Sequence, residues 1–216
     1  MSTLTLAVGR PTIADRVFSR SLAVDAVLVV AGAALTAVAA QISIPLQPVP
    51  ITGQTLAVLL VGVTLGATRG ALSLALYAVL GLAGLPVFAP NDDGSHLTGS
   101  AALNSASFGY VIGFIFAAAL TGWLAQRQWD RKFLRALGAF FAGSVVPFAF
   151  GLVWLAVWLG NAGYPNDLNS VLASGLYPFI IGGVIKAALG AGIISLAWFG
   201  ARKADERKQN REIEQA

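Results

Sequence analysis

The sequence predicts an all-α, polytopic integral membrane protein built from six transmembrane helices. Hydrophobic residues make up 56% of the chain and charged residues only 11%, so the chain is too apolar to cover a globular surface in water. Its apolar residues fall into long stretches, and crossing about 30 Å of hydrocarbon takes roughly 20 such residues. The basic residues avoid alternate connections between these stretches, as the positive-inside rule requires.

Six stretches carry few or no charges and approach the length of a span, the second being the shortest at about 16 residues. They run over 23–44, 53–68, 71–90, 108–126, 136–160 and 176–201. The predicted organisation is a cytoplasmic arm at 1–22, a transmembrane domain at 23–201 and a cytoplasmic polar tail at 202–216. The tail mixes both signs of charge, which indicates a solvated end without chemistry of its own.

The N-terminal arm places Arg10, Arg16 and Arg20 ahead of the first apolar stretch, an order that signal peptides share. The stretch continues to Ile44, which is long enough to span, and prolines follow it rather than a small-residue cleavage pattern. We therefore expect the first stretch to be a retained membrane helix.

Small residues form a stripe in this first span, namely Gly32, Ala33, Thr36 and Ala37. A small-xxx-small spacing lets a second helix approach closely. The spacing is compatible with a helix of a partner protein and with a helix of the same chain.

The first outer connection, 45–52, contains three prolines, so it cannot be helical throughout. Polar side chains lie in and beside it, at Gln47, Thr52 and Gln54. An ordered segment of this kind suits a cap over an outward-facing pocket, and it also suits a stiff linker. The sequence leaves both interpretations open.

The basic residues lie on the arm, the tail and two of the connections, with one exception inside a span. The other connections, 45–52, 91–107 and 161–175, contain no Lys or Arg. The positive-inside rule therefore predicts that both termini are cytoplasmic and that these three connections face outward. The residues that define this partition are Arg10, Arg16, Arg20, Arg69, Arg127, Arg131, Lys132, Arg135, Arg202, Lys203, Arg207, Lys208 and Arg211.

The exception is Lys186, which sits between apolar residues in the sixth span. An ammonium at mid-membrane costs about 2.5 to 3.5 kcal/mol on insertion scales, so such a residue usually faces a cavity, a partner or a ligand. The alternative is a lysine that snorkels to the interface or donates to a backbone carbonyl. The position favours ligand contact over this alternative.

The residue inventory excludes several classes of function. The chain has no Cys and a single His, His96, which leaves no thiolate metal site and little imidazole chemistry. No P-loop is present, so an ATP site would belong to a partner. We expect no cofactor and no nucleic-acid partner, because the basic charges follow the membrane spans. An intramembrane enzyme lacks paired carboxylates, since Asp25 lies at a helix entrance and Asp92, Asp93 and Asp167 lie outside the spans.

Three segments, 44–55, 65–71 and 77–88, together resemble the BioY family of biotin transporters, and the similarity resumes at 109–114 and 178–186. Members of this family are the substrate-binding S components of energy-coupling factor transporters. The resemblance implies a six-helix fold in the bacterial cytoplasmic membrane and an outward-facing vitamin pocket capped by the first outer loop. It also implies that Ala33 and Ala37 dock a transmembrane coupling protein, which works with a pair of ATPases.

Two departures from the family pattern bear on the ligand. Gly183 stands where the family typically has an Asp, one turn before Lys186, and the stretch 105–110 replaces a familiar glycine-rich motif. Another small vitamin or a biotin precursor therefore remains an alternative ligand.

A pocket for biotin needs an apolar wall and a few placed polar groups. The expected wall residues are Tyr77, Phe88, Tyr110 and Phe179, for which ordinary helix packing is the alternative interpretation. The expected hydrogen-bonding residues are Thr52, Gln54 and Asn104, and Lys186 would meet the anionic or carbonyl end of the ligand.

Overall fold

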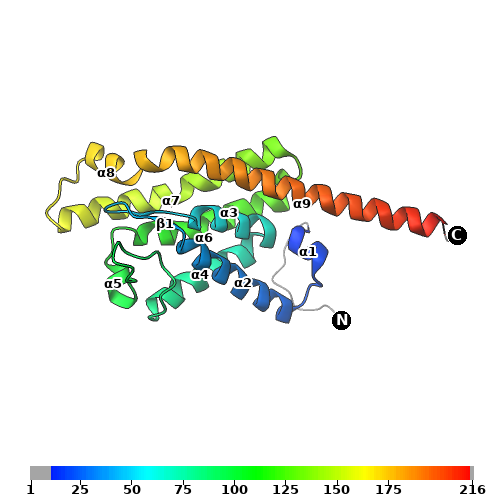
Figure 1. Cartoon of the computed structure of the whole chain (residues 1–216), viewed down its shortest axis with the longest axis horizontal. Coiled ribbons are helices and arrows are strands. Elements are labelled where there is room, and N and C mark those ends of the chain that lie inside the picture. The colour runs from blue at the N-terminus through cyan, green and yellow to red at the C-terminus, as the bar shows by residue number, and fades with distance from the viewer. Residues whose placement is uncertain (1–10, 215–216) are drawn as a thin grey trace.

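The computed structural model describes residues 11–214, and its main elements are the helices that the apolar stretches predict (Figure 1). Of the described helices, four are long and apolar enough to cross a membrane, and two shorter apolar helices complete a set of six. The set consists of α2 (Leu22–Ala40), α3 (Gln54–Leu65), α4 (Ala67–Leu82), α6 (Phe108–Gln126), α7 (Phe133–Asn161) and α9 (Ile180–Glu214). The all-α membrane fold is confirmed, with boundaries that differ at α3, α4 and α9.

The turn between α3 and α4 lies earlier than the sequence predicts. Gly66 adopts φ +87°, a conformation that favours glycine, and it ends the 12-residue α3. Arg69, predicted to lie on the connection, is therefore in the first turn of α4. α4 in turn ends at Leu82, because Gly84 has φ +106° and Pro86 follows.

The connections carry the smaller elements. The proline-rich segment, predicted to be non-helical, forms a hairpin of β1 (Ser43–Ile44) and β2 (Ile51–Thr52), in which Ser43 pairs with Thr52. The remaining elements are α1 (Ile13–Val17), α5 (Gly99–Leu103), η1 (Trp129–Arg131), α8 (Leu168–Gly175) and η2 (Tyr177–Phe179).

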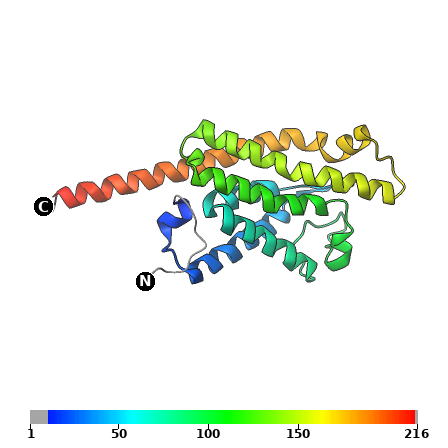
Figure 2. The ribbon, with the colours of Figure 1, turned by 180° about the vertical axis from the view of Figure 1, so that it is seen from behind.

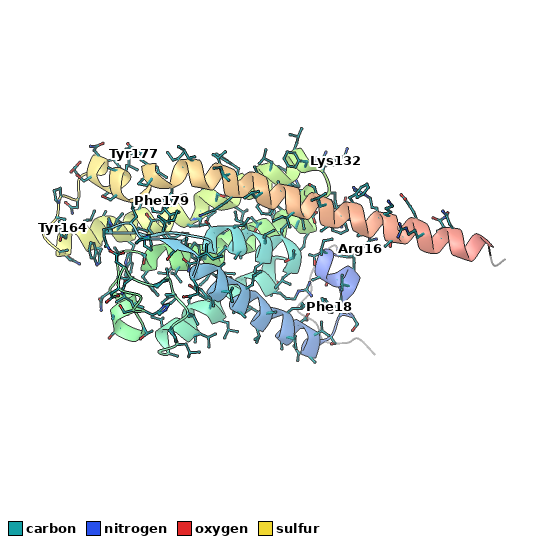
Figure 3. All side chains as sticks on the ribbon, viewed as in Figure 1. Arg16, Phe18, Lys132, Tyr164, Tyr177 and Phe179 are labelled. Carbon is teal, nitrogen blue, oxygen red and sulfur yellow. The ribbon has the colours of Figure 1, made fainter. Side chains whose placement is uncertain are left out.

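The bundle has two chemically different ends. The hairpin, α5 and α8 gather at one end, and α1 with the final turns of α9 lies at the other, which the reverse view also shows (Figure 2). Tyr164 and Tyr177 mark the first end, and Arg16 and Lys132 mark the second (Figure 3). The connections without Lys or Arg thus share one end, here called the outer end, and the basic connections share the other, the inner end.

α6 lies at the centre of the packing, against α3, α4 and α7. Glycines let the backbones approach closely: a side chain at Gly62 of α3 would collide with Thr121 of α6. α2 packs on α4 in the same way, because an added Cβ at Gly32 would lie 2.5 Å from the Ser73 hydroxyl.

A buried ionic cluster ties the arm to the inner end. The Arg69 guanidinium, 2% exposed, lies 2.8 Å from an Asp15 carboxylate oxygen and 3.2 Å from one of Asp25. Burial acts to raise the pKa of Asp15, but hydrogen bonding from the Thr12 backbone N–H and the charge of Arg69 outweigh it, so the pKa is lowered. Asp25, predicted at a helix entrance, is thus a buried partner of Arg69.

α9 continues well beyond the predicted sixth span. It runs to Glu214 as one helix, and its final turns extend past the rest of the molecule (Figure 1). The side chains of Lys203 and Arg207 are exposed there, as expected for a solvated tail.

Candidate substrate-binding site

A cavity of about 390 Å³ opens at the outer end, beneath the proline-rich hairpin. Its walls come from the hairpin, from the segments that flank α5, and from α6, α7 and α9. The predicted site residues that line it are Thr52, Gln54, Phe88, Asn104, Tyr110, Phe179 and Lys186. A volume of this size, mostly apolar with a few polar groups, suits a small organic ligand.

Lys186 reaches the cavity from α9. Its ammonium donates to the backbone carbonyl oxygen of Thr52 at 2.5 Å and to the hydroxyl of Thr55 at 3.0 Å. Both acceptors are neutral, and Lys186 has no ion-pair partner within 4.0 Å among the side chains described, those of residues 11–207, 209 and 210. A ligand with a negative or strongly polar oxygen would therefore supply the counterpart that the protein does not.

A short hydrogen-bond chain continues from this lysine into the bundle. The Thr52 hydroxyl donates to the Gln54 side-chain oxygen at 2.8 Å, and the Gln54 amide nitrogen donates to the Tyr77 hydroxyl. Tyr77 is fully buried behind Gln54 instead of forming the cavity wall. It thus holds the orientation of Gln54, which the sequence alone did not indicate.

The aromatic wall is a triangle of rings from three elements. Tyr110 of α6, Phe148 of α7 and Phe179 of η2 have ring centroids 6.0 to 6.4 Å apart. The Tyr110 hydroxyl is satisfied by the backbone carbonyl of Gly175, at 2.8 Å. This leaves its ring to face the cavity, as an apolar surface with a fixed position.

Phe88 forms another part of the wall. Its ring meets Tyr77 edge-on, with centroids 5.3 Å apart, and it packs on Phe108 at 6.5 Å. A side chain at Gly81 of α4 would collide with the Phe88 ring, so that glycine makes room for the wall.

Asn104 lies at the rim, where its side chain is exposed. Its amide nitrogen donates to the backbone carbonyl of Ser100 at 2.8 Å, which caps α5. The indole N–H groups of Trp154 and Trp158 hold the backbone carbonyls of Ser105 and Asn104, each at 2.9 Å. Two tryptophans of α7 therefore fix this rim.

The lining residues that sequence reasoning missed include Thr55, Asp92, Phe148 and Trp158. Asp92 accepts a hydrogen bond from the Gln47 side-chain nitrogen at 3.3 Å, and this bond joins two of the connections that line the cavity. Thr55 directly follows the predicted site residue Gln54 in the sequence. This adjacency is the sequence feature that could have identified Thr55 as a lining residue. Phe148 and Trp158 lie in a uniformly apolar helix, where nothing in the sequence sets them apart.

The small-residue stripe of α2 lies largely inside the chain. Ala33 is 2% exposed and belongs to the buried core, and Ala37 is half-buried against it. Packing on α4 therefore accounts for this stripe, and the docking role of Ala33 and Ala37 stays a prediction.

Comparison of this sequence with known proteins identifies its family. A family model described as the BioY family matches residues 12–203. The chain belongs to the BioY family. A BioY-family relative from Thermotoga maritima, named a biotin transporter, is 37% identical over 158 residues, which cover 73% of this chain and 86% of the relative. A probable biotin transporter from Pyrococcus horikoshii is 35% identical over 156 residues, covering 72% and 84%.

The fold of this BioY-family chain is similar to a crystal structure of the S-component for biotin from an ECF-type ABC transporter. The two share a TM-score of 0.57 and 25% sequence identity, over 79% of this chain and 88% of the solved one. Gly183, where the resemblance led us to expect an acidic residue, faces open space, since an added Cβ would meet no atom within 4 Å.

Proposed function

We propose that this multi-pass membrane protein is the component that captures biotin at the outer-end cavity and carries it across the cytoplasmic membrane. The observation that carries the proposal is Lys186, whose intramembrane ammonium meets a mostly apolar cavity in a chain of the BioY family. Relatives named biotin transporters and the biotin S-component structure support this ligand.

The cavity chemistry matches the parts of biotin. The aliphatic and bicyclic body would lie against Tyr110, Phe148 and Phe179. The carboxylate or the ureido carbonyl would accept from Lys186, which then exchanges a backbone carbonyl for a ligand oxygen. Thr52 and Gln54 would serve the remaining donors and acceptors of the ureido group.

The energy that drives transport would come from partner proteins. The sequence carries no P-loop, and the similar solved structure is the S-component for biotin from an ECF-type ABC transporter, so we propose a transmembrane coupling protein with a pair of ATPases as partners. The gathering of basic connections at one end supports a topology in which both termini are cytoplasmic. A role as a transporter component also sets the intramembrane enzyme aside.

One residue, Gly183, supports an alternative ligand for the cavity. Gly183 removes the carboxylate that the resemblance places beside Lys186, and this altered surrounding suits a related vitamin or a biotin precursor. The competing ligands would share a carboxylate or a cyclic urea on an apolar body.

Equilibrium binding of labelled biotin to the purified full chain tests the proposal, with unlabelled biotin, a biotin precursor and unrelated vitamins as competitors. We expect unlabelled biotin to compete best. Stronger competition by the precursor or by another vitamin would transfer the assignment to that ligand.

A further inference from the structure

The connection between α6 and α7, with the helix ends that flank it, presents several exposed aromatic and basic side chains at the inner end. We call this surface the 123–135 patch. Trp129 is 41% exposed and Phe133 46% exposed, although large aromatic side chains usually avoid water. The exposed members of the patch are Trp123, Arg127, Trp129, Lys132, Phe133, Leu134 and Arg135.

The patch is held in a fixed orientation by the two residues at its centre. Asp130 is fully buried, and its carboxylate accepts a hydrogen bond from the Trp198 indole N–H at 2.5 Å. The Arg131 guanidinium lies over the same Trp198 ring, 3.4 Å from its centroid. Because both side chains are bound to α9, Trp129 and Lys132 on either side remain at the surface.

The exposed cations of the patch have no acidic partners within the described chain. Among the side chains that the structure describes, those of residues 11–207, 209 and 210, no ion pair includes Arg127, Lys132 or Arg135. Arg127 stacks on Trp123, with its guanidinium carbon 3.8 Å from the ring centroid. Stacking occupies the face of a guanidinium and leaves its edge N–H groups for an anion.

The location gives this surface a membrane environment. The patch joins the ends of two apolar spans, and Figure 3 shows Lys132 at the end of the bundle opposite Tyr164. A connection between two spans lies at the depth of the lipid headgroups, where tryptophans anchor and basic side chains attract anionic lipids. Three cations with neighbouring aromatic rings match a phosphate joined to an acyl chain better than a phosphate alone.

We propose that the 123–135 patch binds the headgroup of an anionic phospholipid. In this site Lys132, Arg135 and the edge of Arg127 contact the phosphate, and Trp129 and Phe133 lie among the upper acyl segments. The site is separate from the substrate cavity, which lies at the other end of the bundle. It therefore does not depend on which ligand is transported.

The test uses the full chain in nanodiscs of phosphatidylcholine with increasing fractions of phosphatidylglycerol. Retention of phosphatidylglycerol on the protein is measured by native mass spectrometry, and thermal unfolding is followed in the same discs. We expect phosphatidylglycerol to be retained and to raise the unfolding temperature. The double variant Lys132→Gln, Arg135→Gln should bind it roughly thirtyfold more weakly, about fivefold for each charge removed.

A matched control removes the same charge elsewhere. Lys203→Gln with Arg207→Gln lies on the exposed extension of α9 and should change phosphatidylglycerol binding by less than about threefold, because the surface potential falls within a Debye length. Equal losses in both double variants would mean general charge attraction and would overturn the site.

Two further arms separate other occupants. Inorganic phosphate added to phosphatidylcholine discs should not raise the unfolding temperature, and an equal rise would show a site for free phosphate instead of a lipid. If the Lys132→Gln, Arg135→Gln variant kept phosphatidylglycerol but lost co-purification with the coupling module, the patch would be a protein-docking surface and the proposal would fail.

Discussion

The ammonium of Lys186 lies 2.5 Å from the backbone carbonyl oxygen of Thr52, the last residue of the proline-rich hairpin. This hydrogen bond joins α9 to the hairpin. This contact spans 134 residues of sequence and places the only described intramembrane lysine at the cavity that the hairpin covers. A ligand oxygen that replaced the carbonyl would alter the link between the hairpin and α9. Recognition and capping of the ligand would then act through one side chain.

Thr55 offers the most conservative test of this contact. Thr55→Val removes the hydroxyl that lies 3.0 Å from the Lys186 ammonium and keeps the shape of the side chain. One lost hydrogen bond is worth about 0.5 to 1.5 kcal/mol, so biotin affinity should change by roughly two- to tenfold. Thr64→Val is the matched control, because the Thr64 hydroxyl bonds only within its own helix, to Leu60 at 2.6 Å. If both variants changed biotin binding equally, the effect would come from altered helix stability and not from the contact between Thr55 and Lys186.

Gly183→Asp tests whether the missing carboxylate limits biotin binding. The new side chain has space, since nothing lies within 4 Å of a Cβ at this position, and it would stand one turn from Lys186. We expect biotin affinity to hold or rise, measured by titration calorimetry. Gly192→Asp on the same helix, also in open space, controls for adding a charge to α9. Biotin binding that appears only in Gly183→Asp would show that the natural pocket serves another ligand.

Arg69→Met should destabilise the fold more than any surface charge change. The substitution removes the Arg69 guanidinium from the buried carboxylates of Asp15 and Asp25, and breaking a buried pair costs about 3 to 5 kcal/mol. Arg20→Met is the control, because Arg20 is partly exposed and its pair with Asp15 is worth about 1 kcal/mol or less. Thermal unfolding in detergent measures both. A small effect at Arg69 would mean that the arm contributes little to the bundle.

Two substitutions in the small-residue stripe of α2 distinguish internal packing from docking of a partner protein. Ala33→Leu should lower biotin binding and uptake together, because Ala33 is buried and overpacking a core costs about 1 to 3 kcal/mol. Ala37→Leu, at a half-buried position, should leave binding by the isolated protein nearly intact and lower uptake in cells if this face docks a coupling protein. Unchanged uptake in Ala37→Leu would remove the docking role.

The fold was largely predictable because hydropathy and charge act over whole segments. The apolar stretch at 108–126 coincides with α6, and the placement of Lys and Arg predicted which connections share an end. The turn at Gly66 was not predictable in the same way. Arg69 looked like a loop residue, yet it is buried by pairing with Asp15 and Asp25, which are 54 and 44 residues away in sequence.

The site was only partly predictable because its geometry depends on contacts between distant segments. A charge inside a span singled out Lys186, and seven of the eight expected residues line one cavity. Tyr77 was misplaced as a wall residue, since an aromatic side chain gives no sign of whether it faces a cavity or supports a neighbour. In the sequence, nothing sets Phe148 apart from the other aromatic residues of α7. Only its ring contacts with Tyr110 and Phe179 in the structure identify it as a wall residue.

Titration of biotin into the purified full chain and into its Lys186→Met variant tests the proposed function most directly. Methionine keeps most of the stem volume and removes the charge and its donors, so the variant should fold while losing a charge-assisted hydrogen bond worth about 1.5 to 3 kcal/mol. Lys203→Met on the exposed end of α9 is the control and should bind like the natural chain. We predict tight binding by the natural chain and a loss of roughly ten- to a hundredfold in Lys186→Met. Weak, roughly millimolar binding by the natural chain, unchanged in Lys186→Met, would contradict both the biotin assignment and the role of the lysine.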